Sequence, residues 1–155
     1  MKRTYSEGTW FAVPLQRKAG IAVGVVARAA KKGKILLGYF FGPCRQVMPR
    51  LDEVEKLLPN QTIRIAHVSA LGLIQGDWPI IGNSKLWRRS DWPTPVFVRR
   101  EPIGNRTWRV YYSDTNPNEI VREELTISDN ESYPVDCLLG STATEIELTN
   151  LLICK

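Results

Sequence analysis

The N-terminal third of the chain carries two hydrophobic patterns that are typical of β-strands. The segment Trp10 to Leu15 has the two-residue period of a strand, with Phe11, Val13 and Leu15 on one face and Trp10, Ala12 and Pro14 on the other. Residues Gly20 to Ala27 and Lys34 to Phe41 are apolar on both faces, as strands buried on both sides are. Lys31-Lys32-Gly33 lies between these two runs and is typical of a hairpin turn. The pattern therefore predicts a meander of three antiparallel strands.

Proline and glycine refine this prediction. Pro14 has no N–H to donate to a ladder, so the first strand is expected at an edge of the sheet. Gly24 and Gly38 interrupt the second and third strands, where a sheet bends sharply or another backbone comes close. We therefore expect a curved antiparallel sheet, with a small SH3-like barrel as one form of it.

The periodicity becomes helical from Pro49 to Leu58, and Pro59 ends this segment. Its apolar positions fall on one stripe: Leu51, Val54, Leu57 and Leu58. A second helix is predicted from Thr142 to Ile153, with Ser141 or Thr142 as its cap. The side chains expected to face inward from it are Ile146, Thr149, Leu152 and Ile153.

The remaining hydrophobic runs are again typical of strands. We predict strands at Thr62 to Leu71, Val96 to Arg100 and Thr107 to Tyr112, and a less regular one at Glu119 to Ile127. Pro102-Ile103-Gly104-Asn105 is expected to join two of them as a hairpin. No linker or internal repeat divides the chain, so residues 1–155 are expected to form one α+β domain, with one mid-chain helix and one C-terminal helix.

The chain has neither a membrane-span pattern nor a signal-peptide pattern. The longest apolar run, Ala19 to Ala27, has nine residues, about half of what a membrane span needs. Lys2-Arg3 is followed by polar residues instead of an apolar stretch. We therefore expect a cytoplasmic protein that does not enter the membrane.

The net charge of +5 is unevenly distributed. Residues 1–50 carry ten Lys and Arg against one acidic residue, whereas residues 117–155 carry two against eight. A basic segment can bind nucleic acid. It can also be covered by an acidic segment of the same fold, and charged faces that pair within the domain are the interpretation we favour.

Residues that carry catalytic or metal chemistry are sparse. His67 is the single histidine, lies in a predicted strand, and has no nucleophile motif near it. Cys44, Cys137 and Cys154 are too widely spaced for a zinc or redox pair. The glycines form no phosphate-binding motif. We expect no catalysis, no bound metal and no cofactor.

Tryptophan and arginine are concentrated in the middle of the chain. Trp78, followed by Pro79, is expected in the core, whereas Trp87 and Trp92 lie among charged residues. Tryptophan and arginine are the usual anchors of protein interfaces. The partner-binding residues predicted on this basis are Trp87, Arg88, Arg89, Trp92, Arg99 and Arg100. If they bind a partner, alanine at Trp92 or Arg89 is expected to weaken binding with little change in melting temperature.

Four stretches of the first two thirds of the chain resemble the immunity protein 26 family of bacterial polymorphic toxin systems. They are Glu7-Gly8-Thr9-Trp10-Phe11-Ala12-Val13-Pro14-Leu15, Gly20 to Val26, Ile35-Leu36-Leu37-Gly38-Tyr39-Phe40-Phe41-Gly42 and Gly76-Asp77-Trp78-Pro79-Ile80-Ile81-Gly82. The resemblance implies a cytoplasmic antidote that binds and neutralises a cognate toxin domain by steric occlusion, without catalysis. Its shared residues are taken as fold determinants: Gly8, Gly38, Trp78, Pro79 and Gly82.

Two alternatives remain open at this stage. The first is a small β-barrel that binds nucleic acid through Arg17, Lys18, Arg28, Lys31, Lys32 and Lys34. The second is an enzyme in which His67 takes part in the reaction.

Overall fold

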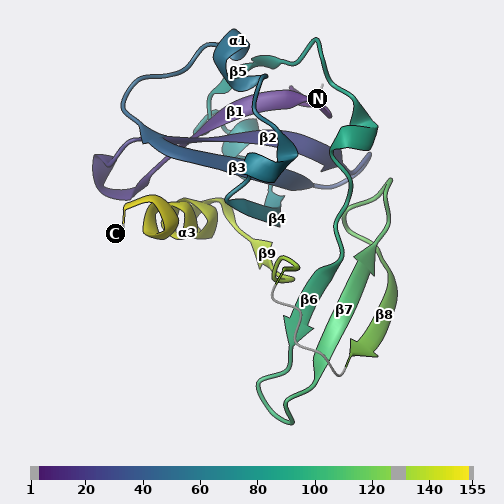
Figure 1. The fold of residues 1–155 in the computed structure, drawn as a ribbon. Coiled ribbons are helices and arrows are strands. Elements are labelled where there is room, and N and C mark those ends of the chain that lie inside the picture. Colours follow the sequence, from purple (N-terminus) through teal and green to yellow (C-terminus); the bar gives the residue numbers. More distant parts are fainter. Residues whose placement is uncertain (1–3, 127–131, 154–155) are drawn as a thin grey trace.

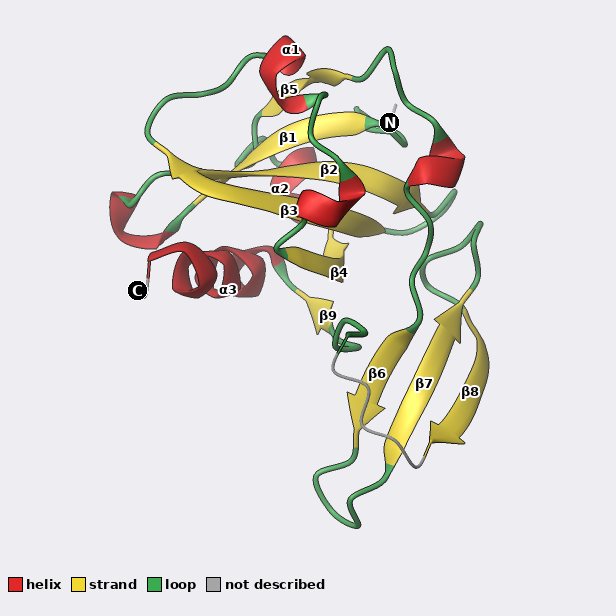
Figure 2. Cartoon of the chain, viewed as in Figure 1, coloured by secondary structure: helices red, strands yellow, loops and turns green. Residues whose placement is uncertain are grey.

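The computed structural model describes residues 4–126 and 132–153, which form a larger body and a smaller sheet beneath it (Figure 1). The body is built on six strands: β1 (Thr9–Pro14), β2 (Ile21–Ala29), β3 (Ile35–Arg45), β4 (Arg64–Ser69), β5 (Ile80–Asn83) and β9 (Leu138–Leu139). The smaller sheet has three: β6 (Phe97–Arg100), β7 (Thr107–Tyr112) and β8 (Ile120–Thr126). The helices are α1 (Leu51–Val54), α2 (Leu71–Ile74) and α3 (Ser141–Ile153), with single 3-10 turns η1 (Gln16–Lys18), η2 (Pro59–Gln61) and η3 (Arg89–Asp91) (Figure 2).

The predicted α+β class and the N-terminal meander are confirmed. Strands β1, β2 and β3 pair as antiparallel neighbours, and the strand order of the larger sheet is β5-β1-β2-β3-β4-β9. Only β9 runs parallel to its neighbour. The sheet ends at β5 and β9, which do not pair with each other, so it is not closed into the SH3-like barrel that we expected as one form. A barrel needs its two edges to meet, whereas here the chain leaves the sheet after β5 and builds a second one.

The prediction that the first strand lies at an edge is wrong. Strand β1 lies between β2 and β5, although β5 pairs only with the segment from Thr9 to Phe11. Pro14 lies beyond that short pairing, where no N–H is required on the side of β5. Proline therefore excludes a ladder bond at its own position without making the whole strand an edge.

The larger sheet is buried on both faces, as the apolar runs predicted. One hydrophobic cluster contains Phe11, Phe40 and Trp78 and is covered by α3 through Leu148. The other contains Trp10, Phe41, Trp92 and, from the smaller sheet, Phe97 and Val110. Each face thus has a core of its own, and the second core joins the two sheets.

Gly24 and Gly38 make room for an aromatic side chain. A Cβ atom at Gly24 or at Gly38 would lie 2.9 Å from carbons of the Phe40 ring. At Gly24 the ring of Phe11 would also be 2.7 Å away. The two Phe rings meet edge to face with their centroids 5.9 Å apart. The predicted approach of another backbone is therefore corrected: the group that comes close to both glycines is an aromatic side chain.

The mid-chain helix is shorter than predicted. Helical geometry covers only Leu51 to Val54, and Leu58 is extended, with φ −106° and ψ 153°. The residue before a proline avoids helical dihedrals, so Pro59 forces this turn out of the helix. As a result Leu58 is 57% exposed instead of lying on a buried stripe.

The C-terminal helix forms where it was predicted, and two of the four side chains expected to face inward, Thr149 and Leu152, do so, whereas Ile146 and Ile153 do not. Its buried residues are Thr144, Leu148 and Thr149, whereas Ile146 and Ile153 are 46% and 39% exposed. This orientation is supported by hydrogen bonds. The Trp78 indole Nε1 donates to Glu145 Oε2 (2.9 Å), and the backbone N–H of Gln16 donates to Thr149 Oγ1 (2.9 Å). Ser141 is the first helical residue rather than the cap.

The hairpin predicted at residues 102–105 is confirmed. It joins β6 to β7, and its turn contains Gly104 at φ 92° and Asn105 at φ 53°, two residue types that tolerate positive φ. The acidic C-terminal part of the chain pairs with arginines of the middle part: Glu123 with Arg99, Glu124 with Arg109, and Glu147 with Arg64. Among the described residues, no helix has the length and apolar character of a membrane span.

Candidate partner-binding surface

Four of the six predicted binding residues lie on the segment that connects the two sheets. This crossover, residues 84–96, leads from β5 to β6 and contains Trp87, Arg88, Arg89 and Trp92. The other two residues, Arg99 and Arg100, lie on β6 itself. The structure therefore divides the predicted set into two groups, one at the junction of the sheets and one on the smaller sheet.

Trp92 is a core residue. Only 6% of its surface is exposed, and its ring meets Trp10 edge to face at 5.9 Å and Tyr39 at 5.1 Å between centroids. Trp87 stacks on Trp92 at 5.2 Å and covers Gly8, where a Cβ would lie 2.9 Å from the indole. The expectation that both rings are surface anchors is corrected accordingly: Trp92 faces the core, and Trp87 lies half-buried above it.

Arg89 is committed to partners within the chain. Its Nε donates to Glu7 Oε1 (2.9 Å) and its Nη1 to Asp114 Oδ2 (2.6 Å). The buried Arg28 donates to the other oxygen of Asp114 (2.9 Å). Partial desolvation raises the pKa of Asp114, but the hydrogen bonds from Arg28 and Arg89 outweigh it and hold the pKa below its usual value. This ion cluster ties the N-terminal segment, β2 and the loop after β7 to the crossover.

Arg88 differs from its neighbour. Its side chain is 77% exposed, and its ion pair with Asp91 is a long one, with 3.9 Å between Nε and Oδ2. A pair of this kind contributes little to stability in water, so the guanidinium is available to another molecule.

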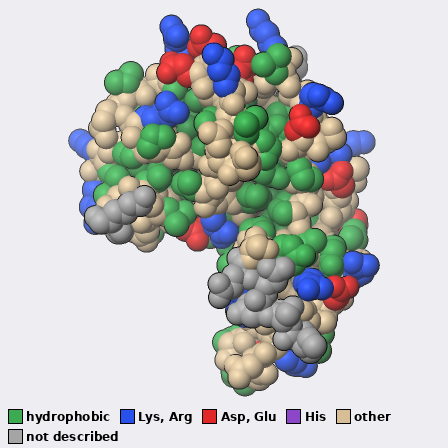
Figure 3. Space-filling model, in the orientation of Figure 1, with side chains coloured by type: hydrophobic (Ala, Val, Ile, Leu, Met, Phe, Trp, Pro, Cys, Tyr) green, Lys and Arg blue, Asp and Glu red, His purple; other side chains and the backbone are tan. Residues whose placement is uncertain are grey.

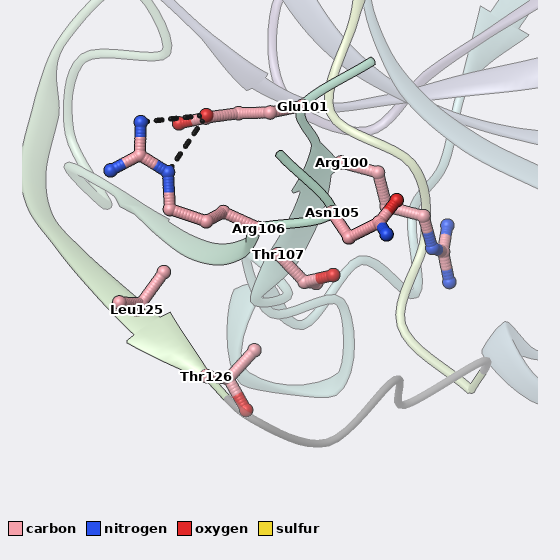
Figure 4. A pocket seen from close by; sticks show the side chains of 7 residues that line it. All are labelled: Arg100, Glu101, Asn105, Arg106, Thr107, Leu125 and Thr126. Carbon is pink, nitrogen blue, oxygen red and sulfur yellow. Dashed lines mark hydrogen bonds and ion pairs between the residues drawn. The ribbon is translucent and has the colours of Figure 1, made fainter. Parts of the chain in front are cut away.

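On the smaller sheet, Arg99 is paired more closely with acidic side chains than Arg88 is. Arg99 Nη1 lies 3.0 Å from Glu123 Oε1 and 3.8 Å from Asp136 Oδ2. Arg100 lines an open polar pocket of about 560 Å³ at the far end of the sheet, beside Asn105 (Figure 4). In that pocket Arg106 is already paired with Glu101, which also accepts a hydrogen bond from the Trp108 indole at 2.6 Å.

The surface next to the crossover contains a groove that sequence analysis did not identify as a site. Its volume is about 650 Å³, and the segment after α1 and η2 form one side of it while the crossover forms the other. The apolar lining residues are Leu57, Leu58, Pro59, Leu86 and Trp92, and the polar ones are Glu55, Lys56, Asn60 and Asp91. Leu58 and Leu86 are 57% and 69% exposed.

The leucines of this groove were missed because the helical pattern assigned Leu57 and Leu58 to the core. The useful signal was Pro59, because the residue before a proline avoids helical dihedrals and Leu58 therefore lies in an extended segment at the surface. Figure 3 shows the same side of the body, with hydrophobic side chains exposed across it and charged side chains along its upper edge.

His67 lies between the two sheets. It is 3% exposed, and its ring is 4.9 Å from Phe97 and 4.1 Å from Tyr112 between centroids. Neither ring nitrogen has a hydrogen-bond partner among the described residues. Burial lowers the pKa of His67 to about 4. His67 therefore lies in a strand, as predicted, but the expectation of a hydrogen-bonded or partly exposed histidine is corrected: its ring is buried against two aromatic side chains.

The described cysteines and acidic residues do not form a metal-binding cluster. Cys44 and Cys137 are free thiols, and Cys154 lies outside the described residues. Within residues 4–126 and 132–153, no three His, Cys, Asp or Glu side chains are placed to hold a metal ion together.

The basic residues of the nucleic-acid alternative do not form one patch. Arg28 is buried and paired with Asp114. Arg17 and Lys18 precede β2, whereas Lys31, Lys32 and Lys34 follow it. Nine strand residues separate the two groups, a span of about 30 Å.

The comparison with protein families adds to this geometry. The family model described as Immunity protein 26 matches residues 6–109, about two thirds of the chain. No curated protein and no solved structure gave a significant match. The matched segment contains β1 to β6, the whole crossover and the first part of β7. The chain therefore belongs to the immunity protein 26 family.

Proposed function

We propose that this protein binds a cognate toxin domain in the cytoplasm and neutralises it by covering the toxin's working surface. The family match carries the proposal, because an immunity protein acts on a toxin. Inhibition of this kind requires a rigid scaffold and a complementary surface and needs no reaction by the inhibitor. The doubly buried sheet supplies such a scaffold.

The groove beside the crossover is the part of the surface that we assign to the toxin. Exposed leucines over an aromatic floor can receive an apolar side chain, and desolvated apolar pockets ringed by polar residues are where binding energy concentrates in interfaces. Arg88 lies next to this groove through its contact with Asp91. Arg88 thus remains a direct contact in the proposal, Trp92 lines the groove, and Trp87 stacks on Trp92.

The other predicted residues take different roles. Arg89 positions the crossover through Glu7 and Asp114. Arg99 and Arg100 lie on the smaller sheet and extend the contact area if the toxin spans both sheets. A specific interface buries about 800 Å² on each partner, so the groove is its centre and not its whole extent.

Substitution in the groove tests this assignment. Leu58→Asp and Leu86→Asp place a charge at positions that are already exposed, so both variants are expected to fold. Cells that produce the cognate toxin domain are expected to lose protection with either variant. Ile103→Asp is the matched control, because Ile103 is 86% exposed at the tip of the distant β6–β7 hairpin.

Full protection by both leucine variants at wild-type expression would show that the groove is not the binding surface. If the wild-type protein itself gave no protection, the proposed function would fail as a whole.

A further inference from the structure

The two edge strands of the smaller sheet, β6 and β8, differ in their backbone contacts outside the sheet. On the β6 side, Val98 forms a parallel bridge with Val135, and the Val98 amide donates to Pro134 O at 2.9 Å. The Asp136 amide donates back to Val98 O at 2.8 Å. On the other side the order β6-β7-β8 ends, and β8 pairs with β7 alone in the described part of the chain. Strand β8 is thus an edge strand of the smaller sheet within the described residues.

Of the features that usually protect an edge strand, the β8 residues supply charged side chains, at Arg122, Glu123 and Glu124. The β8 sequence, Ile-Val-Arg-Glu-Glu-Leu-Thr, contains no proline, glycine or lysine. Its apolar side chains Ile120, Val121 and Leu125 are 42%, 58% and 53% exposed. An edge strand with exposed apolar side chains is a template for pairing with a further strand.

The charged side chains of β8 have contacts inside the sheet. Glu123 pairs with Arg99 at 3.0 Å, and Glu124 pairs with Arg109 at 3.2 Å. The Arg122 guanidinium lies 4.0 Å from the centroid of the Tyr111 ring. These contacts hold the charges against the sheet faces, so the backbone edge itself stays accessible.

We propose that β8 pairs in antiparallel fashion with β8 of a second copy of this chain, which joins two three-stranded sheets into one of six strands. The argument is the self-complementarity of the strand. A two-fold axis at Glu123 places Arg122 opposite Glu124 of the second copy and Val121 opposite its Leu125. Arg122 and Glu124 then meet on one face of the joined sheet, and Val121 and Leu125 meet on the other. Each of these contacts occurs twice because the pair is symmetric.

Neighbouring registers lose this match. Because opposite residues of an antiparallel pair lie on one face, a two-fold axis must pass at a residue position. An axis at Arg122 places Val121 opposite Glu123 and Ile120 opposite Glu124. An axis at Glu124 places Leu125 opposite Glu123. Either register sets carboxylates against apolar side chains.

The favoured register brings the two Glu123 side chains together at its centre. Like charges directly opposite each other disfavour pairing. Here each Glu123 is neutralised by Arg99 of its own chain at 3.0 Å. The paired segment spans about 23 Å, which is less than a standard interface, so we expect a reversible dimer with a dissociation constant in the micromolar range.

Charge exchange across the predicted pair tests the proposal. Sedimentation velocity of the full chain, from about 1 to 300 µM, is expected to show a monomer–dimer equilibrium. Arg122→Glu and Glu124→Arg each place like charges opposite one another twice, and each is expected to weaken the dimer about tenfold or more. An equimolar mixture of the two variants restores both opposite-charge pairs and is expected to dimerise as the wild type does.

The exposed Arg50–Glu53 pair beside α1 provides matched controls. Arg50→Glu and Glu53→Arg make the same charge changes far from β8 and are expected to leave the dimer unchanged. Rescue by mixing cannot arise from a change in the stability of either monomer. A wild-type protein that stays monomeric throughout this range, or a dimer that both single reversals leave intact, would overturn the proposal. Because no toxin is present, the result is independent of the proposed function.

Discussion

At the scale of single residues, burial separates side chains that looked alike in the sequence. Trp78, Trp87 and Trp92 lie within fifteen residues, but Trp78 and Trp92 are 0% and 6% exposed while Trp87 is half-buried. The same division applies to Arg88, which is largely exposed, and Arg89, which is paired with two acidic residues. Sequence identifies these residue types as anchors, but it does not show which way each one points.

Trp92 is expected to determine stability more than binding. Trp92→Ala removes a ring that contacts Trp10, Tyr39 and Phe41, and deletion of a buried aromatic ring costs about 3–5 kcal/mol. Urea denaturation is expected to show this loss for Trp92→Ala and a clearly smaller one for Trp87→Ala. Equal losses for the two variants would mean that Trp87 is as deeply packed as Trp92.

His67 is expected to make the free energy of unfolding depend on pH between about 4 and about 6.5. The pKa of the ring is about 4 in the folded protein and about 6.5 in an unfolded chain. The unfolded state therefore binds more protons between these values, and stability falls as pH drops from about 6.5 towards 4. At pH 5 the loss is roughly 2 kcal/mol.

His67→Leu removes the titrating group and keeps an apolar side chain at the site. Urea denaturation between pH 7.5 and 5 is expected to show a much flatter dependence for this variant than for the wild type. The same slope in both proteins would contradict the account of His67. Asp114, Glu101 and Glu124, whose pKa values are lowered, act at a more acidic pH, where stability is lost as they become protonated.

At the scale of elements, the described fold depends on a few polar contacts between segments that are distant in the sequence. Trp78 donates to Glu145 and so fixes the rotation of α3 on the sheet. Arg89 and Arg28 meet at Asp114 and so fix the crossover against β2. Helical periodicity alone could not identify the buried face of α3, because its apolar side chains are distributed around the helix and the contact with Trp78 selects among them.

Glu145 is expected to anchor α3. Glu145→Gln keeps an oxygen that can accept from the Trp78 indole, whereas Glu145→Ala leaves the indole N–H of a fully buried side chain without this acceptor. The expected cost of the alanine variant is about 1–3 kcal/mol, and that of the glutamine variant is smaller. Thermal unfolding of the two variants side by side measures the difference. If both behaved as the wild type, the orientation of α3 would not depend on this contact.

Arg89 is expected to hold the crossover between the sheets. Arg89→Ala breaks contacts with Glu7 and Asp114 and is expected to lower stability by about 1 kcal/mol, because the site is partly exposed and screened by water. Arg88→Ala is the control and is expected to remain within about 0.5 kcal/mol of the wild type. A larger loss for Arg88→Ala than for Arg89→Ala would reverse the roles that the structure gives to these neighbours.

At the scale of the whole molecule, local patterns predicted most of the strands. Thr107–Tyr112 forms as predicted, and the two apolar runs of the N-terminal third form the central strands β2 and β3. Two short strands, β5 and β9, were not predicted, because four and two residues carry too little periodicity. The separation into two sheets was also not predicted, since it depends on contacts between residues far apart in sequence.

The candidate site was predictable only in part. The crossover was identified from its tryptophans and arginines, whereas the groove beside it arises where a helix stops early and leaves Leu58 exposed across from Leu86. Such a surface depends on tertiary placement and has no motif of its own.

The central claim is that the protein works by occupying the toxin's surface and carries out no reaction on it. Titration of the purified protein into a fixed concentration of its cognate toxin domain, with the toxin's activity as readout, tests this most directly. The account predicts that activity falls in proportion to the protein added, reaches its minimum at one equivalent, and does not change with incubation time once binding is complete. Progressive loss of toxin activity at a small fraction of one equivalent would show turnover and contradict the account.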